Sequence, residues 1–238
     1  MKTLVIMPTF NEAASLGSTV QVLMESAAKF DLLIVDDNSP DGTGLLADEL
    51  AAQSSLKNNR IFVLHRSNKD GLGAAYLEGF AWAFARDYEV VVEMDADGSH
   101  RAKDLPNILK AAEKADLVIG SRWIPGGAVV NWPWYRKLIS RAGNFYARAM
   151  LHTNINDMTA GYRAYKTDFL KQLNLGGVAA RGYAFQVEMA LRVLRSGGVV
   201  VEVPITFVER SIGKSKMTTA IVLEALWLVT KWSFYRSA

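Results

Sequence analysis

The chain has 238 residues, of which 50% are hydrophobic, and it contains no cysteine. This length suits one large α/β domain, and the lack of cysteine excludes a disulfide framework, a thiolate nucleophile and a zinc–thiolate site. The formal net charge of +3 is modest. Because the sequence also carries no helix-turn-helix, zinc-finger or RNA-binding aromatic motif, we expect no nucleic-acid partner.

Short apolar runs alternate with helical patterns over the first 122 residues. Strands are expected at residues 2–7, 32–35, 61–65, 90–92 and 117–119. Helices are expected between them, at residues 13–28, 43–53, 74–86 and 101–114. This alternation predicts an α/β fold with a Rossmann-like, mostly parallel sheet and helices on both faces.

Acidic side chains follow two of these strands at their carboxyl ends. Asp36 and Asp37 close the second strand, and Asp95-Ala96-Asp97 follows the fourth. Ligands of open α/β sheets bind at that edge. Asp-Ala-Asp can hold a hard divalent cation through carboxylate oxygens while a substrate diphosphate supplies further ligands. Taken alone, so short a pattern favours the alternative, a polar turn with an Asp cap before the next helix.

Several other nucleotide-binding motifs are absent. The sequence has no P-loop, no G-x-G-x-x-G after the first strand and no Gly-x-Ser-x-Gly elbow. Gly71-Leu72-Gly73 is a weak glycine loop, for which a tight turn before a helix and a role near phosphate are equally open.

The regular alternation ends after Arg122, and the charge pattern changes near the same point. Residues 117–156 contain five Lys or Arg and no acid, and a second acid-free run covers residues 210–223. Such segments suggest phosphate groups or an anionic membrane surface as partners. The segment at residues 207–216 ends in the basic stretch 210–216. It is either a solvent-exposed loop or a mobile loop that closes over a substrate phosphate.

Two helical segments are expected in the second half. In residues 136–151, a polar face with a spacing of four opposes an apolar face, which alone slightly favours an ordinary surface helix with a solvated basic side. That polar face comprises Arg136, Ser140, Asn144 and Arg148. Residues 220–229 are apolar except for Glu224 and are too short to span a bilayer. They fit an interfacial helix, or equally a helix packed on the sheet or on a partner subunit. No transmembrane helix or signal peptide is expected.

The ordered set of motifs resembles inverting family-two glycosyltransferases of the GT-A fold. The segments that carry this resemblance are Pro8-Thr9-Phe10-Asn11-Glu12, Val35-Asp36-Asp37-Asn38-Ser39-Pro40-Asp41-Gly42, Asp70-Gly71-Leu72-Gly73, Asp95-Ala96-Asp97-Gly98-Ser99-His100 and Gly120-Ser121-Arg122. Later segments look like those of polyprenol- or dolichol-phosphate mannose synthases. These segments are Gly126-Gly127, Asn131-Trp132, Arg136, Ser140-Arg141, Asn144, Asp157-Met158-Thr159-Ala160-Gly161-Tyr162-Arg163 and the loop at residues 210–216.

The resemblance covers the whole chain and implies transfer of mannose from GDP-mannose to a polyprenyl monophosphate, with a divalent cation, Mg²⁺ or Mn²⁺. It implies one glycosyltransferase domain over residues 1–238, in which residues 1–122 bind the nucleotide sugar and residues 123–238 bind the acceptor and face the membrane. The implied donor-binding residues are Pro8, Thr9, Phe10, Glu12, Val35, Asp37, Asp95, Ala96, Asp97, Arg210 and Lys216.

Other roles follow from the same resemblance. Asp95 and Asp97 would hold the metal, and Asp97 and Arg122 would be catalytic. The acceptor phosphate would face Arg122, Arg136 and Ser140. The enzyme would be cytoplasmic and peripheral on the cytoplasmic face of a membrane, with or without a membrane-embedded partner protein.

The chain departs from the family pattern at three points. Phe10 stands where a Tyr is common, and Ser99 stands where some members carry a Gln that reaches the metal. Many members also carry C-terminal transmembrane helices, which this sequence lacks. Two rivals stay open: the same enzyme class with another donor or acceptor, such as UDP-glucose, and a non-catalytic nucleotide- or lipid-binding module. The second is disfavoured because Asp-Ala-Asp and the basic loop are both intact.

Overall fold

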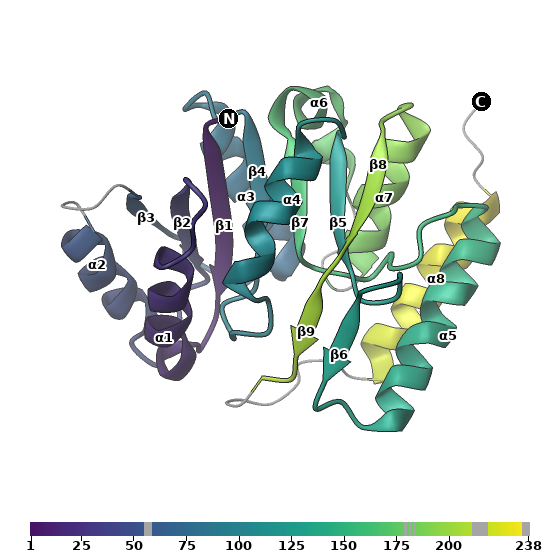
Figure 1. The fold of residues 1–238 in the computed structure, drawn as a ribbon, viewed down its shortest axis with the longest axis horizontal. Coiled ribbons are helices and arrows are strands. Elements are labelled where there is room, and N and C mark those ends of the chain that lie inside the picture. Colours follow the sequence, from purple (N-terminus) through teal and green to yellow (C-terminus); the bar gives the residue numbers. More distant parts are fainter. Residues whose placement is uncertain (55–58, 179, 181, 183, 211–218, 235–238) are drawn as a thin grey trace.

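The computed structural model describes residues 1–54, 59–178, 180, 182, 184–210 and 219–234. Its centre is a seven-stranded sheet with the order β3-β2-β1-β4-β7-β5-β8 (Figure 1). The strands are β1 Thr3–Thr9, β2 Asp31–Asp36, β3 Ile61–His65, β4 Val90–Glu93, β5 Leu117–Ser121, β7 Arg163–Lys166 and β8 Val200–Pro204. Only β7 runs antiparallel to its neighbours, so the mostly parallel sheet is confirmed.

Helices cover both faces of this sheet. They are α1 Ala13–Met24, α2 Thr43–Ser54, α3 Leu72–Phe84, α4 Leu105–Ala112, α5 Trp134–Leu151, α6 Thr167–Gln172, α7 Ala184–Arg195 and α8 Thr219–Phe234, with short 3-10 turns at Ala102–Asp104 and Leu175–Gly177. The helix expected at residues 101–114 is therefore split into a 3-10 turn and the shorter α4. None of the helices in the described ranges is both long and apolar enough to cross a bilayer.

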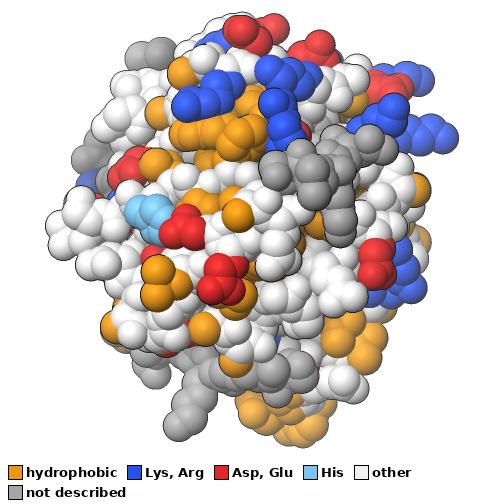
Figure 2. All heavy atoms as spheres, turned by 90° about the vertical axis from the view of Figure 1, so that its left-hand side faces the viewer, with side chains coloured by type: hydrophobic (Ala, Val, Ile, Leu, Met, Phe, Trp, Pro, Cys, Tyr) orange, Lys and Arg blue, Asp and Glu red, His pale blue; other side chains and the backbone are white. Residues whose placement is uncertain are grey.

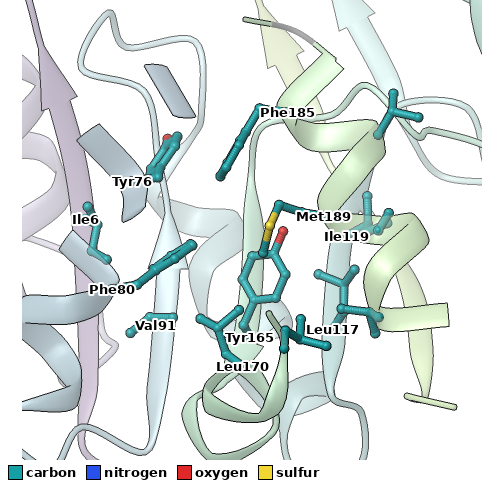
Figure 3. Packing of buried hydrophobic residues seen from close by; sticks show 14 of the residues in the cluster. Ile6, Tyr76, Phe80, Val91, Leu117, Ile119, Tyr165, Leu170, Phe185 and Met189 are labelled. Atoms are coloured by element: carbon teal, nitrogen blue, oxygen red, sulfur yellow. The ribbon is translucent and has the colours of Figure 1, made fainter. Parts of the chain in front are cut away.

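The hydrophobic core lies in two layers because strand side chains alternate between the faces. Along β1, Leu4 and Ile6 pack against α3, whereas Val5 and Met7 face α1 and α4. Figure 3 shows the first layer, where Tyr76 and Phe80 of α3 point toward α7 and β7. The rings of Tyr76 and Phe185 are stacked with centroids 5.9 Å apart. This packing fixes β4 and its carboxyl end between two helical layers.

The sheet edge at β3 is bordered by cations. Figure 2 looks onto this side and shows hydrophobic side chains flanked by Lys and Arg. The Arg60 guanidinium lies 5.3 Å from the Phe62 ring centroid, and that of Arg86 lies 3.9 Å from the Trp82 ring. Charged side chains at an exposed strand edge oppose unwanted pairing with another chain.

A small second sheet and a helix pair lie beside the β8 end of the main sheet (Figure 1). Strands β6 Ala128–Val130 and β9 Thr206–Val208 pair in parallel. Helices α5 and α8 run alongside one another, linked by a 2.5 Å hydrogen bond between the hydroxyls of Tyr146 and Thr230. These elements build the wall of the site described below.

The glycine loop at residues 71–73 has two structural roles. Gly71 has φ +86°, a backbone conformation that favours glycine. A methyl group at Gly73 would lie 2.7 Å from Cδ2 of Phe185 and 2.8 Å from the carbonyl oxygen of Ala180. We therefore expect Gly73→Ala to lower the free energy of unfolding by about 1–3 kcal/mol, because the core must shift.

A matched control is Gly17→Ala on α1, where a methyl group would have nothing within 4 Å. That change should raise the unfolding free energy by about 0.5–1 kcal/mol, since alanine is the better helix former. Urea denaturation followed by circular dichroism measures both changes. Equal effects of the two substitutions would contradict the packing described here.

Candidate active site

The two carboxylates of the Asp-Ala-Asp segment lie just beyond the carboxyl end of β4. Asp97 is held by a tight turn, in which its Oδ1 accepts hydrogen bonds from the backbone N–H and the hydroxyl of Ser99, at 3.0 and 2.6 Å. Asp95 is supported by His100, whose Nδ1 accepts a 3.0 Å hydrogen bond from the Asp95 backbone N–H. His100 is only 3% exposed and stacks on Tyr162 with ring centroids 4.8 Å apart.

His100 therefore has a structural role in placing Asp95. With Nδ1 accepting, the imidazole proton is assigned to Nε2, which lies 3.8 Å from Oδ2 of Asp95. Ser99 orients Asp97 through its two hydrogen bonds. This role accounts for the serine at position 99 and requires no contact between Ser99 and a metal.

The two carboxylates have opposite pKa shifts. Desolvation raises the pKa of Asp95, and the nearby charge of Asp97 adds to this effect. Desolvation also disfavours the charged form of Asp97, but the hydrogen bonds from Ser99 and the charges of His100 and Arg210 together outweigh it and lower the pKa of Asp97. Two carboxylates crowded in this way are stabilised by a bound cation.

The donor atoms suit a hard divalent cation. No cluster of three or more His, Cys, Asp or Glu able to hold a metal occurs in the part of the chain that the structure describes. A cation at Asp95 and Asp97 would therefore complete its shell with oxygens of a substrate or of water, as Mg²⁺ does at nucleotide sites.

A cavity of about 180 Å³ opens next to these carboxylates. Its polar lining comprises Asp95, Asp97, Arg122, Arg136, Ser140, Thr159 and Arg210. The rest of its wall is largely apolar and comes mainly from α5 and α8, with the residues Trp132, Ile139, Gly143, Tyr146, Ala147, Val187, Phe207, Val222, Ala225, Leu226 and Val229. The cavity thus combines charged side chains with an apolar wall, and Trp132 and Phe207 lie against the guanidinium of Arg122.

Arg122 is anchored by a buried ion pair. Its Nε and Nη2 donate to the two carboxylate oxygens of Asp157 at 2.7 and 2.6 Å, and Nη2 also donates to the Thr159 hydroxyl at 3.0 Å. Asp157 is fully buried and also accepts from the Arg122 backbone N–H. The structure therefore places Arg122 in the cavity wall, with its guanidinium held in one orientation.

Arg136 and Arg210 reach the cavity with carboxylate partners of their own. Nη1 of Arg136 lies 2.5 Å from both carboxylate oxygens of Glu209, and its guanidinium stacks 4.2 Å from the Trp132 ring. Nη1 of Arg210 lies 3.4 Å from Oδ2 of Asp97. Lys216, the other expected donor-phosphate ligand, lies outside the described residues.

The expected donor-side residues gather at the carboxyl ends of β1 and β2. Phe10 is half-buried, and Nζ of Lys69 lies 3.8 Å from its ring centroid. Asp37 is ion-paired with Arg66. The side chain of Val35 is in the core, so only its main chain lies at this edge.

The remaining donor-side residues lie at the end of β1 and directly after it. The Thr9 hydroxyl donates to Oδ1 of Asp36 at 2.9 Å, and Glu12 accepts from the Ser15 hydroxyl at 2.9 Å. Pro8 pairs in register with Val35. Apart from Arg210 and Lys216, the donor-side residues expected from the sequence thus lie at the carboxyl ends of the neighbouring strands β1, β2 and β4.

The polar face of α5 points inward, and its apolar face is exposed. Asn144 is only 2% exposed and bonds Asp157 and Thr159, whereas Leu138 and Phe145 are 60% and 72% exposed. The interpretation of α5 as an ordinary surface helix with a solvated basic face is therefore wrong. The polar side chains of α5 bond residues of the cavity wall, so this face is turned inward. The apolar side chains of the opposite face therefore lie on the molecular surface.

Sequence reasoning missed two residues of the site. Glu209 pairs with Arg136, and it directly precedes the acid-free run that drew attention to residues 210–223. Asp157 lay inside a motif that carried the resemblance but was given no role. Its partner Arg122 is 35 residues away in sequence, so no local pattern could reveal the pair.

The profile of glycosyl transferase family 2 matches residues 4–173 of the chain, which is more than half of its length. The protein belongs to glycosyl transferase family 2. The chain is therefore an enzyme of this family, and the resemblance of its motifs to family-two glycosyltransferases is confirmed.

Two curated relatives align over 232 residues. An undecaprenyl-phosphate mannosyltransferase of Micrococcus luteus is 53% identical, covering 98% of this chain and 94% of its own. A polyprenol monophosphomannose synthase of Mycolicibacterium smegmatis is 49% identical, with coverages of 97% and 86%.

Solved structures share the fold at low identity. A glucosyl-3-phosphoglycerate synthase of Mycobacterium tuberculosis, solved with Mn²⁺, UDP-glucose and phosphoglyceric acid, has TM-score 0.72 and 17% identity, with coverages of 100% and 81%. A mannosyltransferase of Pyrobaculum calidifontis, solved with GDP-Man and Mn²⁺, has TM-score 0.62 and 18% identity, with coverages of 98% and 71%. The expected GT-A fold is confirmed.

Proposed function

We propose that this family-2 glycosyltransferase transfers mannose from GDP-mannose to a polyprenyl monophosphate. The observation that carries the proposal is the mixed lining of the cavity, which joins cations and the carboxylates of Asp95 and Asp97 to apolar side chains of α5 and α8. A polyprenyl monophosphate has the same division between an anionic head and an apolar tail. The names of the relatives at 49% and 53% identity support this acceptor and mannose as the sugar.

The reaction is a direct displacement with inversion. An acceptor phosphate oxygen forms a bond to the anomeric carbon of mannose, the bond from that carbon to the diphosphate breaks, and its electron pair leaves with GDP. The phosphate is already an anion near neutral pH, so no strong general base is required. Positioning and charge stabilisation then provide the rate enhancement.

Separate groups of this chain serve the two substrates. Asp95 and Asp97 would hold a divalent cation, which neutralises charge on the departing diphosphate. Arg210, close to Asp97, is placed to bind the donor phosphates. Arg122, Arg136 and Ser140 would face the acceptor phosphate, to which the guanidinium groups supply positive charge and N–H donors.

The donor base is tested by comparing GDP and UDP. We expect GDP to bind more tightly than UDP in isothermal titrations with Mn²⁺ present. Tighter binding of UDP would overturn GDP-mannose and favour a UDP-sugar, such as the UDP-glucose found with the M. tuberculosis fold relative.

The proposal also places α5 and α8 at a membrane surface, where the acceptor tail is embedded. Most exposed large hydrophobic side chains of the described residues lie on these two helices, namely Trp134, Tyr135, Leu138, Ile139, Phe145, Leu223, Leu226, Trp227 and Phe234. Cations accompany them: Nζ of Lys231 lies 5.1 Å from the Trp227 ring. Apolar side chains with nearby cations are typical of helices that lie in an anionic interface.

Sedimentation with anionic phospholipid vesicles tests this placement. Phe145→Ser and Trp227→Ser should each lower vesicle binding roughly tenfold, because one large buried side chain is worth about 1.5–3 kcal/mol. Leu45→Ser is the control, since Leu45 on α2 is 73% exposed but far from this surface. If Leu45→Ser weakened binding as much as the other two changes, the assignment of α5 and α8 would be wrong. A membrane-embedded partner protein stays a prediction.

A further inference from the structure

Two consecutive residues of opposite charge contact both ends of the polar part of the cavity. Glu209 and Arg210 directly follow β9. Glu209 places both carboxylate oxygens 2.5 Å from Nη1 of Arg136, on the acceptor side. Arg210 places Nη1 3.4 Å from Oδ2 of Asp97, on the donor side. One dipeptide therefore links the two halves of the site.

The backbone before this dipeptide is well fixed. The Val208 N–H donates to the carbonyl oxygen of Ser99 at 3.1 Å, and the Glu209 N–H donates to that of Val130 at 3.0 Å. Phe207 packs edge-on against both His100 and Trp132. The carboxylate of Glu209 is thus presented to Arg136 by β9 itself.

Glu209 occupies the position that an anionic ligand of Arg136 would need. The Arg136 guanidinium is stacked on Trp132 and is only 19% exposed. A carboxylate and a phosphate present similar oxygens to a guanidinium. The Glu209 carboxylate and a phosphate compete for the same N–H donors of Arg136. Only the molecules in which Arg136 is not paired with Glu209 can bind phosphate there, so the pair lowers the apparent affinity for phosphate.

We propose that Glu209 is a positioning residue that holds Arg136 and keeps its phosphate site filled until the donor is bound. This inference rests on the proposed function. When Asp97 binds the cation of the donor complex, Arg210 exchanges Asp97 for the donor diphosphate. The added negative charge of the diphosphate beside Arg210 disfavours a second anion at the adjacent Glu209, so the Glu209 side chain turns away from Arg136 while its backbone stays bonded to Val130. The acceptor phosphate then takes its place, so donor binding promotes acceptor binding.

The test is the affinity for geranyl phosphate, a short soluble acceptor analogue, measured calorimetrically with and without GDP and Mn²⁺. For the unmodified enzyme, we expect GDP and Mn²⁺ to tighten binding about fivefold, which is the scale of one solvent-accessible ion pair. Glu209→Gln should bind geranyl phosphate about fivefold more tightly without GDP, and GDP should then add little.

The control is Glu113→Gln, which changes the net charge equally at an exposed position at the end of α4. It should leave both affinities unchanged. If Glu209→Gln lowers the thermal midpoint, Glu209→Asp serves instead. It keeps the charge but withdraws the carboxylate by one methylene, so its affinity without GDP should be intermediate.

The outcomes separate this inference from the function on which it rests. If the unmodified enzyme binds geranyl phosphate but Glu209→Gln binds it no more tightly without GDP, the role of Glu209 is refuted and the acceptor is retained. If the unmodified enzyme binds no geranyl phosphate under either condition, the proposed acceptor and the role of Glu209 both fall.

Discussion

Replacing Asp97 with alanine is expected to lower mannosyl transfer by about 1,000-fold while leaving the protein folded. The change removes one of two side chains available to the cation, and charge stabilisation by a catalytic metal is worth several kcal/mol, at one factor of ten per 1.36 kcal/mol. It also removes the partner of Arg210. The fold should survive, because Asp97 makes its other contacts to Ser99 within one turn.

Initial rates at saturating donor and acceptor, with a thermal melt of each variant, measure this effect. Asp48→Asn is the matched control, since Asp48 is an exposed carboxylate on α2 whose partner is His65. It should retain full activity. If Asp97→Ala kept activity within about threefold of the control, metal catalysis at this carboxylate would be excluded, since that change is below one kcal/mol.

Replacing Asp157 with alanine is expected to lower the free energy of unfolding by about 3–5 kcal/mol, because it leaves a buried guanidinium uncompensated. Asp157 is fully buried and accepts hydrogen bonds from the Arg122 side chain, its backbone N–H and Asn144. For a chain of this size, that loss corresponds to a fall in thermal midpoint of roughly 10 °C.

Urea denaturation measures the loss as a lower midpoint at unchanged slope. Asp168→Ala is the control, because Asp168 is 96% exposed and its carboxylate lies 3.8 Å from Nζ of Lys171. That surface pair should contribute less than about 1 kcal/mol. In a double variant with Arg122→Met, the cost should be smaller than the sum of the single changes, because the stranded charge is gone. Equal losses in Asp157→Ala and Asp168→Ala would contradict a structural role for the buried pair.

The sequence allows the first half of the fold to be predicted, because buried parallel strands there are short apolar runs between helical patterns. Strand β7 could not be predicted in this way. It begins with Arg163, which is fully buried because its guanidinium donates to the carbonyl oxygens of Met158, Ala160 and Gln186. Such partners come together only in the folded chain, so a strand that starts with arginine does not look buried.

Strand β8 was missed for a similar reason. Glu202 lies in its middle, where its carboxylate accepts hydrogen bonds from the backbone N–H groups of Asn156 and Asp157. The periodicity of α5 predicts two faces but not which one is buried. That choice depends on Glu209 and Asp157, which lie outside the helix and bond its polar side chains only in the folded chain. Asp95 and Asp97 were accessible to sequence reasoning because their spacing and their place after a strand are local features.

The central claim is tested most directly by a transfer assay with radiolabelled GDP-mannose and a short polyprenyl phosphate, with and without EDTA. The account predicts organic-soluble label that depends on a divalent cation and is lost with EDTA. If UDP-glucose gave label where GDP-mannose gave none, the metal site would stand but the donor would be wrong. If no sugar nucleotide produced label with the cation present, the proposed transfer to a polyprenyl phosphate would be contradicted.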